Sequence, residues 1–97
     1  MDVRFNVRYH VSMTYRVAWS NRAERQLRRL DRHAQGVVQA AAAALADDPR
    51  PRGTQKLRGR RDHHRTRVGI HYRIVYTITD RVRLVEIVAV GSREDIY

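Results

Sequence analysis

The N-terminal stretch of the chain alternates between apolar and polar positions. Every odd-numbered residue from Val3 to Trp19 is apolar, and the residues between them are polar except Ala18. This period of two predicts a strand with one buried face, but residues 3–19 would span roughly 56 Å when extended, too long for one strand of a small domain. We expect residues 15–19 to form the first strand. Residues 1–12 would be an N-terminal extension: an extra edge strand, a partner-binding arm, or the product of a start codon upstream of Met13.

Two helices are predicted after this strand. Asn21 and Glu24 have the spacing of a capping box, so Asn21 would cap the first helix. Asp31 can cap a second helix that ends near Ala46, because the residue before Pro49 is disfavoured in the helical conformation. The short link at Asp31 predicts an antiparallel helical hairpin. The apolar residues at helical spacing are Ala23, Leu27 and Leu30 in the first helix and Ala34, Val38, Ala41 and Leu45 in the second.

Three more strands are predicted in the C-terminal part. They cover residues 65–68, 72–79 and 82–90, with turns at 69–71 and 80–81, and Gly91 is expected to end the last strand. In the middle strand the apolar residues of one face are Tyr72, Ile74, Tyr76 and Ile78. We therefore expect an α+β two-layer sandwich: an N-terminal strand, a helical hairpin, then a three-stranded antiparallel meander (order β-α-α-β-β-β). The helices would cover one sheet face and leave the other open.

Length and composition exclude several classes of protein. The 97 residues are enough for one domain, which we place at residues 13–97, and the absence of cysteine excludes disulfides and thiolate metal sites. The longest apolar run, residues 40–46, is far shorter than a membrane span, and the N-terminus lacks the pattern of a signal peptide. We expect a soluble, cytoplasmic protein without a membrane association.

Charge narrows the choice of partner. Twenty basic residues oppose ten acidic ones, a net charge of +10, and every basic residue except Lys56 is an arginine. Such a charge favours a polyanion, with nucleic acid the leading candidate. The preference for arginine has two explanations: codon usage in a GC-rich genome, or the ability of guanidinium groups to bind phosphate with two hydrogen bonds. Composition alone does not separate them.

Much of the excess charge lies between Arg50 and Arg73, where Asp62 is the only acidic residue. Residues 50–61, preceded by Pro49 and containing Pro51 and two glycines, have the composition of a solvated loop. Arg65, Arg67 and Arg73 alternate with strand-forming residues, so they would lie on the open sheet face. Arg93 and Tyr97 follow the last strand. The set of residues for a phosphate-binding concavity is therefore Arg65, Arg67, Arg73, Arg93 and Tyr97. The alternative is a row of solvated arginines on an exposed sheet.

The histidines do not predict a metal site. His63, His64 and His71 lie close in sequence, but zinc needs three or four ligands and the neighbouring positive charges oppose a cation. We expect no metal and no other cofactor. His64 or His71 could instead carry a proton, because histidine titrates near neutral pH.

Several short motifs, in this order, resemble the RelE/ParE superfamily of bacterial toxins, particularly its RelE branch. The resemblance covers nearly all of the chain from Met13 to Tyr97 and begins with the strand at residues 15–19. Its more specific parts are KLRG at residues 56–59, RTRVG at 65–69, YRIVY at 72–76, VGSRE at 90–94 and DIY at 95–97.

The resemblance implies a toxin of a toxin–antitoxin pair that acts as an mRNA interferase. Such an enzyme enters the ribosomal A site and cuts mRNA without a metal, by attack of a 2′-hydroxyl on the adjacent phosphate. By position, the family's catalytic residues correspond to Arg65, Arg67, Arg73, Arg93 and Tyr97. Arg73 and Arg93 would hold the phosphate, Arg93 could also serve the leaving 5′-oxygen, and Tyr97 would stack on the nucleotide. The implied partners are a cognate antitoxin, mRNA and the ribosome, whose RNA would be contacted by Lys56, Arg58, Arg60, Arg61 and His64.

One departure from the RelE pattern concerns the general base. The better-known pattern has lysines where this chain has Arg65 and Arg67, and an arginine cannot give up its proton in a protein. The base would then be His64 or a tyrosine, or catalysis would be mainly electrostatic and positional. A ParE-like, non-catalytic inhibitor of DNA gyrase is the second hypothesis, and a basic RNA-binding module with neither activity is the third.

Overall fold

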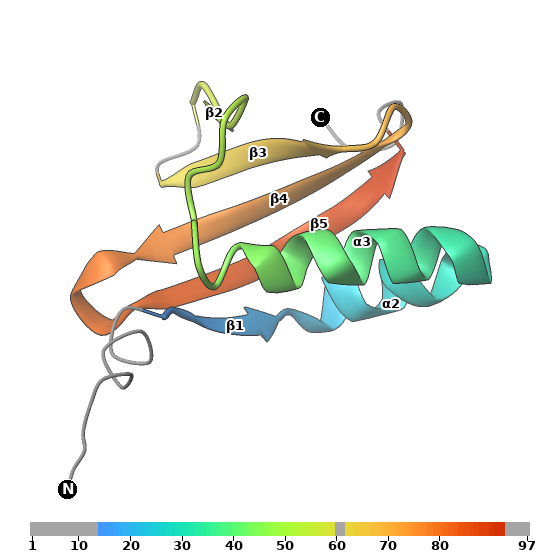
Figure 1. The fold of residues 1–97 in the computed structure, drawn as a ribbon, viewed down its shortest axis with the longest axis horizontal. Coiled ribbons are helices and arrows are strands. Elements are labelled where there is room, and N and C mark those ends of the chain that lie inside the picture. Colours follow the sequence, from blue (N-terminus) through green and yellow to red (C-terminus); the bar gives the residue numbers. More distant parts are fainter. Residues whose placement is uncertain (1–13, 60–61, 93–97) are drawn as a thin grey trace, which may run out of the picture.

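In a computed structural model that describes residues 14–59 and 62–92, two helices cover one face of a five-stranded sheet (Figure 1). The strand order is β1-β5-β4-β3-β2; β1 runs parallel to β5, and the other neighbours are antiparallel. The elements are β1 (Arg16–Trp19), α2 (Asn21–Arg29), α3 (Arg32–Ala44), β2 (Gln55–Lys56), β3 (His63–Val68), β4 (Tyr72–Thr79), the 3₁₀ turn η1 (Asp80–Val82) and β5 (Leu84–Ser92). The predicted α+β class and helical hairpin are confirmed, and the extension at residues 1–12 lies outside the described residues.

The two helices begin at side-chain caps. Asp31 caps α3 as predicted, since its Oδ1 accepts a hydrogen bond from the backbone N–H of Ala34 at 2.8 Å. The cap of α2 is Ser20 rather than the predicted Asn21, because Ser20 has the extended backbone of a cap and its Oγ accepts from the Ala23 N–H at 3.0 Å. The second helix ends at Ala44, two residues before the predicted end.

The main core lies between the helices and the sheet. Ile74 and Tyr76 of β4 and Ile87 of β5 are completely buried beneath the helical hairpin. From α3, Ala42 is buried deeper than the predicted Ala41, which packs at the edge of the core. The alternation in the sequence therefore identifies the correct face of β4. No helix in the described part of the chain is long and apolar enough to cross a membrane.

The opposite sheet face, predicted to be open, is partly covered in the structure. Val75 on β4 and Ala89 on β5 are completely buried on that side, and Leu57, directly after β2, packs against them. A bulge in β5 places Val88 in the same small cluster. The chain from β2 therefore covers one end of this face, and only the other end is left for the arginines.

Two further expectations about β5 are corrected. The strand does not end before Gly91 but includes it, because Gly91 pairs with Arg73 across the sheet and this pairing overrides the local tendency of glycine. The strand also starts at Leu84, two residues later than predicted, because η1 and the left-handed Arg83 (φ 52°) lengthen the turn.

Candidate nucleic-acid interface

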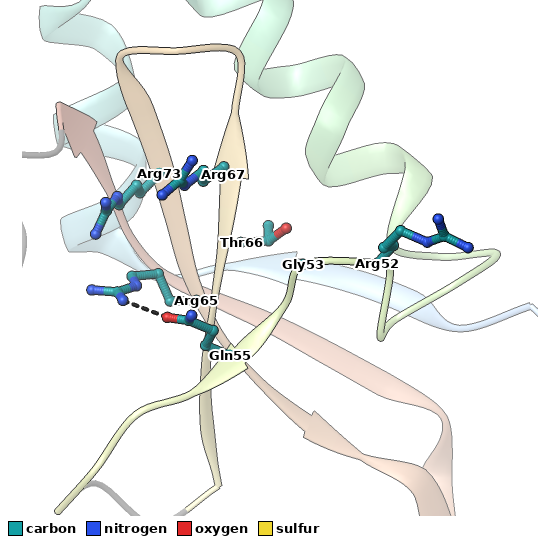
Figure 2. A pocket seen from close by; sticks show the side chains of 7 residues that line it. All are labelled: Arg52, Gly53, Gln55, Arg65, Thr66, Arg67 and Arg73. Carbon is teal, nitrogen blue, oxygen red and sulfur yellow. Dashed lines mark hydrogen bonds between the residues drawn. The ribbon is translucent and has the colours of Figure 1, made fainter.

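Three of the predicted arginines share one end of the sheet. Arg65 and Arg67 lie two residues apart on β3, so their side chains leave the strand on the same side. Arg73 on β4 is the direct cross-strand partner of Arg67 and therefore shares that face. Figure 2 shows the three guanidinium groups on one side of the β3–β4 hairpin. The structure thus brings these three residues together as the sequence predicts.

A second wall of this site comes from β2 and the residues before it. Gln55 pairs with Arg65 in the sheet, and its Oε1 accepts a hydrogen bond from Arg65 Nη2 at 2.7 Å (Figure 2). Between this wall and the hairpin lies a cavity of about 310 Å³, which we call the arginine cavity; it is lined by Arg52, Gly53, Gln55, Arg65, Thr66, Arg67 and Arg73. Arg52, Gly53 and Gln55 were not predicted, because residues 50–61 have the composition of a solvated loop. Thr66 was not predicted because its side chain leaves β3 on the face opposite to Arg65 and Arg67.

The charge of the arginine cavity suits a phosphate. Four of its seven lining residues are arginines and none is acidic. Guanidinium groups keep their charge at any physiological pH and bind phosphate oxygens through two parallel hydrogen bonds. Placed before the reaction begins, such groups also stabilise the negative charge that develops on a phosphate under attack. The cavity can therefore bind an anion and stabilise additional charge on it.

His64 lies on the other side of the sheet. Because it is adjacent to Arg65 in the strand, its side chain leaves on the opposite face, where the ring stacks on Tyr76 with 5.7 Å between centroids. Burial, and then the positive charge of Arg50, lower the pKa of His64 below its ordinary value of 6.5. Its Nδ1 is buried without a hydrogen-bond partner among the described residues. The structure therefore separates His64 from the three arginines.

The described tyrosines also lie away from the arginine face. Tyr72 and Tyr76 pack in the main core, and the Tyr76 hydroxyl donates a hydrogen bond to the Pro49 carbonyl at 2.7 Å. The pKa of Tyr76 is raised, mainly by burial. Tyr15 donates its hydroxyl hydrogen bond to Asp80. Neither His64 nor these tyrosines is placed to take a proton in the arginine cavity.

The remaining predicted residues divide into two groups. Lys56 on β2 and Arg58 in the following turn are exposed, as a contact with RNA would require. The others, Arg60, Arg61, Arg93 and Tyr97, lie outside the described residues. Within the described ranges, no group of three or more histidine, aspartate or glutamate side chains could hold a metal ion.

The sequence matches a family model over residues 17–97, that of the ParE toxin of the type II toxin–antitoxin system parDE. The comparison with curated proteins gives no match. Among solved structures, the toxin–antitoxin complex RelBE2 from Mycobacterium tuberculosis contains a chain with 30% identity and a TM-score of 0.75, covering 86% of this chain and 95% of that one. A mutant of the E. coli toxin RelE in the free state has 26% identity and a TM-score of 0.71, with coverages of 84% and 86%.

A third similar structure is the archaeal RelE–RelB complex from Pyrococcus horikoshii. It has 26% identity and a TM-score of 0.72, and the match covers 87% of this chain and 100% of that one. The family match extends over most of the chain, and these structures share its two helices and sheet. The chain therefore belongs to the ParE toxin family of type II toxin–antitoxin systems, within the RelE/ParE superfamily.

Proposed function

We propose that this toxin is a ribosome-dependent endoribonuclease that cuts mRNA in the A site and so inhibits translation. The observation that carries the proposal is the convergence of Arg65, Arg67 and Arg73 on one cavity without an acidic lining residue. A cavity of this charge fits the phosphate of an RNA strand. The likeness to RelE structures supports cleavage as the activity.

The proposed reaction is an internal transfer at phosphorus. The 2′-oxygen of one nucleotide forms a bond to the adjacent phosphorus, and the bond from phosphorus to the 5′-oxygen of the next nucleotide breaks. The 2′-hydroxyl loses its proton and the leaving 5′-oxygen gains one, so the products are a 2′,3′-cyclic phosphate and a free 5′-hydroxyl. The pentacoordinate state carries more negative charge than the substrate, and the arginines stabilise it.

The protein's contribution in this proposal is electrostatic and positional. Arginine cannot serve as the base, and His64 lies on the opposite sheet face, so we assign no general base to the described residues. Arg67 and Arg73 would orient the phosphate for in-line attack. By the resemblance, Arg93 would share the phosphate and serve the leaving oxygen, and Tyr97 would stack on the nucleotide.

Two kinds of partner belong to this proposal. Ribosomal RNA in the cytoplasm would be contacted by the exposed Lys56 and Arg58, together with Arg60 and Arg61. His64 would contribute less to RNA binding, because its ring packs on Tyr76. A cognate antitoxin would neutralise the toxin, as the complexes of similar toxins with RelB suggest. The excess of positive charge favours an acidic antitoxin segment.

Inhibition of DNA gyrase without catalysis is the second candidate. The match to the ParE family model favours it, as does arginine at the two positions where RelE-type toxins carry lysine. Fold alone does not decide between the two activities, because both occur on this scaffold.

The deciding experiment induces the toxin in bacteria and maps the 5′ ends of cellular mRNA by primer extension. We expect cuts within translated codons, and cleavage by the purified toxin on programmed ribosomes but not on free RNA. Arg73→Ala and Arg93→Ala should each lower cleavage by about a hundredfold or more, as the loss of a transition-state donor does. Arg25→Ala, an exposed arginine on α2, is the matched control and should leave cleavage unchanged. Double-strand DNA breaks without cut mRNA would instead establish the gyrase activity.

A further inference from the structure

A second cavity adjoins the arginine cavity and has different chemistry. It measures about 330 Å³ and lies beside β3, where α3 ends and the chain turns towards β2. We call it the α3 pocket. It shares Arg52, Thr66 and Arg67 with the arginine cavity.

The two cavities meet at the edge of β3. Strand β2 pairs only with His64 and Arg65, so this edge is not covered by β2 at Thr66 and Arg67. Arg67 projects to the arginine face, and Thr66 projects to the helix face, where it is buried. Figure 2 shows the Thr66 side chain on the opposite side of the strand from the three arginines. A ligand can therefore continue from one cavity into the other around the strand edge.

The chemistry changes along this path in the way that a nucleotide changes from phosphate to base. Four arginines and no acidic residue line the arginine cavity. The α3 pocket keeps two of these arginines but adds an acidic residue, Asp48, and a mostly apolar wall of Ala41, Ala44, Leu45 and Pro51. A carboxylate repels a phosphate, but it accepts hydrogen bonds from the amino group of a base. Apolar walls suit the face of an unstacked base, which single-stranded RNA presents.

Asp48 is partly oriented by its own loop. Its Oδ1 accepts a hydrogen bond from the backbone N–H of Arg50 at 3.2 Å. This contact leaves the second carboxylate oxygen to accept from a ligand. A single such acceptor distinguishes cytosine, which carries an exocyclic amino group, from uracil, which has a carbonyl at that position.

We propose that the α3 pocket binds the base of the nucleotide next to the cleaved phosphate, and that Asp48 selects a base with an exocyclic amino group. The inference rests on the proposed function, since it takes RNA as the substrate, and it adds a determinant of sequence preference within that function. The alternative occupant of an apolar pocket in a toxin is an antitoxin side chain, and the experiment separates the two.

The test measures binding of two hexamers, one of deoxycytidine and one of deoxyuridine, to the purified full-length toxin. Neither can be cleaved, because both lack the 2′-hydroxyl. We expect the deoxycytidine hexamer to bind about fivefold more tightly, the low end of the range for a specific base contact. Asp48→Asn keeps the acceptor for Arg50 but should abolish this preference. Asp47→Asn, the neighbouring exposed carboxylate outside the pocket, should retain it.

A second pair of variants tests the space. Ala43 and Ala44 are both exposed in the last turn of α3, but only Ala44 lines the pocket. Ala44→Leu should weaken the binding of both hexamers at least several-fold, because the larger side chain fills the pocket. Ala43→Leu should leave their binding unchanged. Primer extension on induced cells should show the same change in the bases at the cut sites for Asp48→Asn.

The outcomes separate the two proposals. If hexamer binding depends on Arg67 and Arg73 but is unchanged by Ala44→Leu and Asp48→Asn, the base pocket is wrong and the nuclease proposal stands. If hexamer binding is independent of Arg67 and Arg73, the base pocket is overturned, because the phosphate beside the base is then not in the arginine cavity. If the wild-type toxin cuts no RNA on programmed ribosomes, both proposals are overturned. If Ala44→Leu weakens binding of the purified antitoxin but not binding of the hexamers, the pocket binds the antitoxin and the base-pocket proposal is wrong.

Discussion

Gln55 holds Arg65 across the short β2–β3 pairing: its Oε1 accepts a hydrogen bond of 2.7 Å from Arg65 Nη2. Arginine has many rotamers, and a fixed partner reduces the number that remain when substrate binds. In the proposed nuclease, Gln55 would therefore be a positioning residue, which acts through Arg65 rather than on the phosphate.

We expect Gln55→Met, which keeps the length and removes the acceptor, to lower RNA cleavage about tenfold, the loss expected for a hydrogen bond to a charged group. In the Arg65→Ala background the same substitution should have no further effect, because the group that it orients is gone. Measuring cleavage rates for the four proteins of this cycle tests the assignment. An equal loss in both backgrounds would mean that Gln55 acts independently of Arg65.

Ser20 should contribute more to stability than its neighbour Asn21. The Ser20 Oγ caps α2 through the Ala23 N–H and also donates to the Val88 carbonyl of β5 at 3.3 Å. Ser20→Ala should lower the free energy of unfolding by about 1 kcal/mol in urea denaturation. Asn21→Ala should change it by less than about 0.5 kcal/mol, as an exposed position does. A larger loss for Asn21→Ala would place the cap at that residue instead.

Asp80 should make the fold sensitive to strong acid. Its carboxylate accepts two hydrogen bonds from the Arg50 guanidinium, at 2.9 and 3.2 Å, and one from the Tyr15 hydroxyl. These contacts, chiefly the one with Arg50, lower the pKa of Asp80 from 3.8 to about 2. A carboxylate with a lowered pKa in the folded state stabilises the protein above its ordinary pKa, and this stabilisation is lost as the pH falls towards about 2.

The corresponding experiment compares melting temperatures of the wild type and Asp80→Asn. The variant should melt lower at pH 7, and the difference should shrink between about pH 4 and pH 2. Both partners of the ion pair are about half exposed, 52% for Arg50 and 56% for Asp80, so added salt should reduce the difference as well. A difference that does not change with pH would show that the charge of Asp80 contributes nothing.

His64 should destabilise the fold when it is protonated. Burial, and then Arg50, lower its pKa in the folded state, so the unfolded chain binds the proton more readily. The contribution of neutral His64 to the free energy of unfolding should be fully present above about pH 6.5 and should be lost as the pH falls below that value. Between pH 7.5 and pH 5, the melting temperature should fall less for His64→Phe than for the wild type, because phenylalanine keeps the stack on Tyr76 but cannot be protonated. The melting temperature of His71→Phe, a substitution at an exposed turn position, should fall over this pH range as much as that of the wild type.

Much of the fold follows from periods that can be read along the chain. Alternation predicts β3 and β4 and the buried face of β4, and helical spacing with Asp31 predicts the hairpin of α2 and α3. The same parity places Arg65 and Arg67 on one face and His64 on the other, away from the arginines. These features were accessible because each depends on neighbours within a few residues.

Other features depend on contacts between distant parts of the chain. Strand β2 has only two residues, and it exists because Gln55 and Lys56 pair with β3. Gly91 remains in β5 because Arg73 lies opposite it, and Val75 is buried because Leu57 covers it. A local pattern contains no signal for any of these.

The sequence by itself thus determined the family resemblance, the helices and most strands, the positive charge and the shared face of three arginines. Only the tertiary structure decided that Arg52, Gly53 and Gln55 form the other wall of the cavity, and that a pocket lined in part by Asp48 adjoins it. The reason is physical: periodicity records which side of an element is buried, whereas a cavity is formed where separate elements meet. Their meeting depends on strand pairing and on the path of a loop, which the local order of residues does not encode.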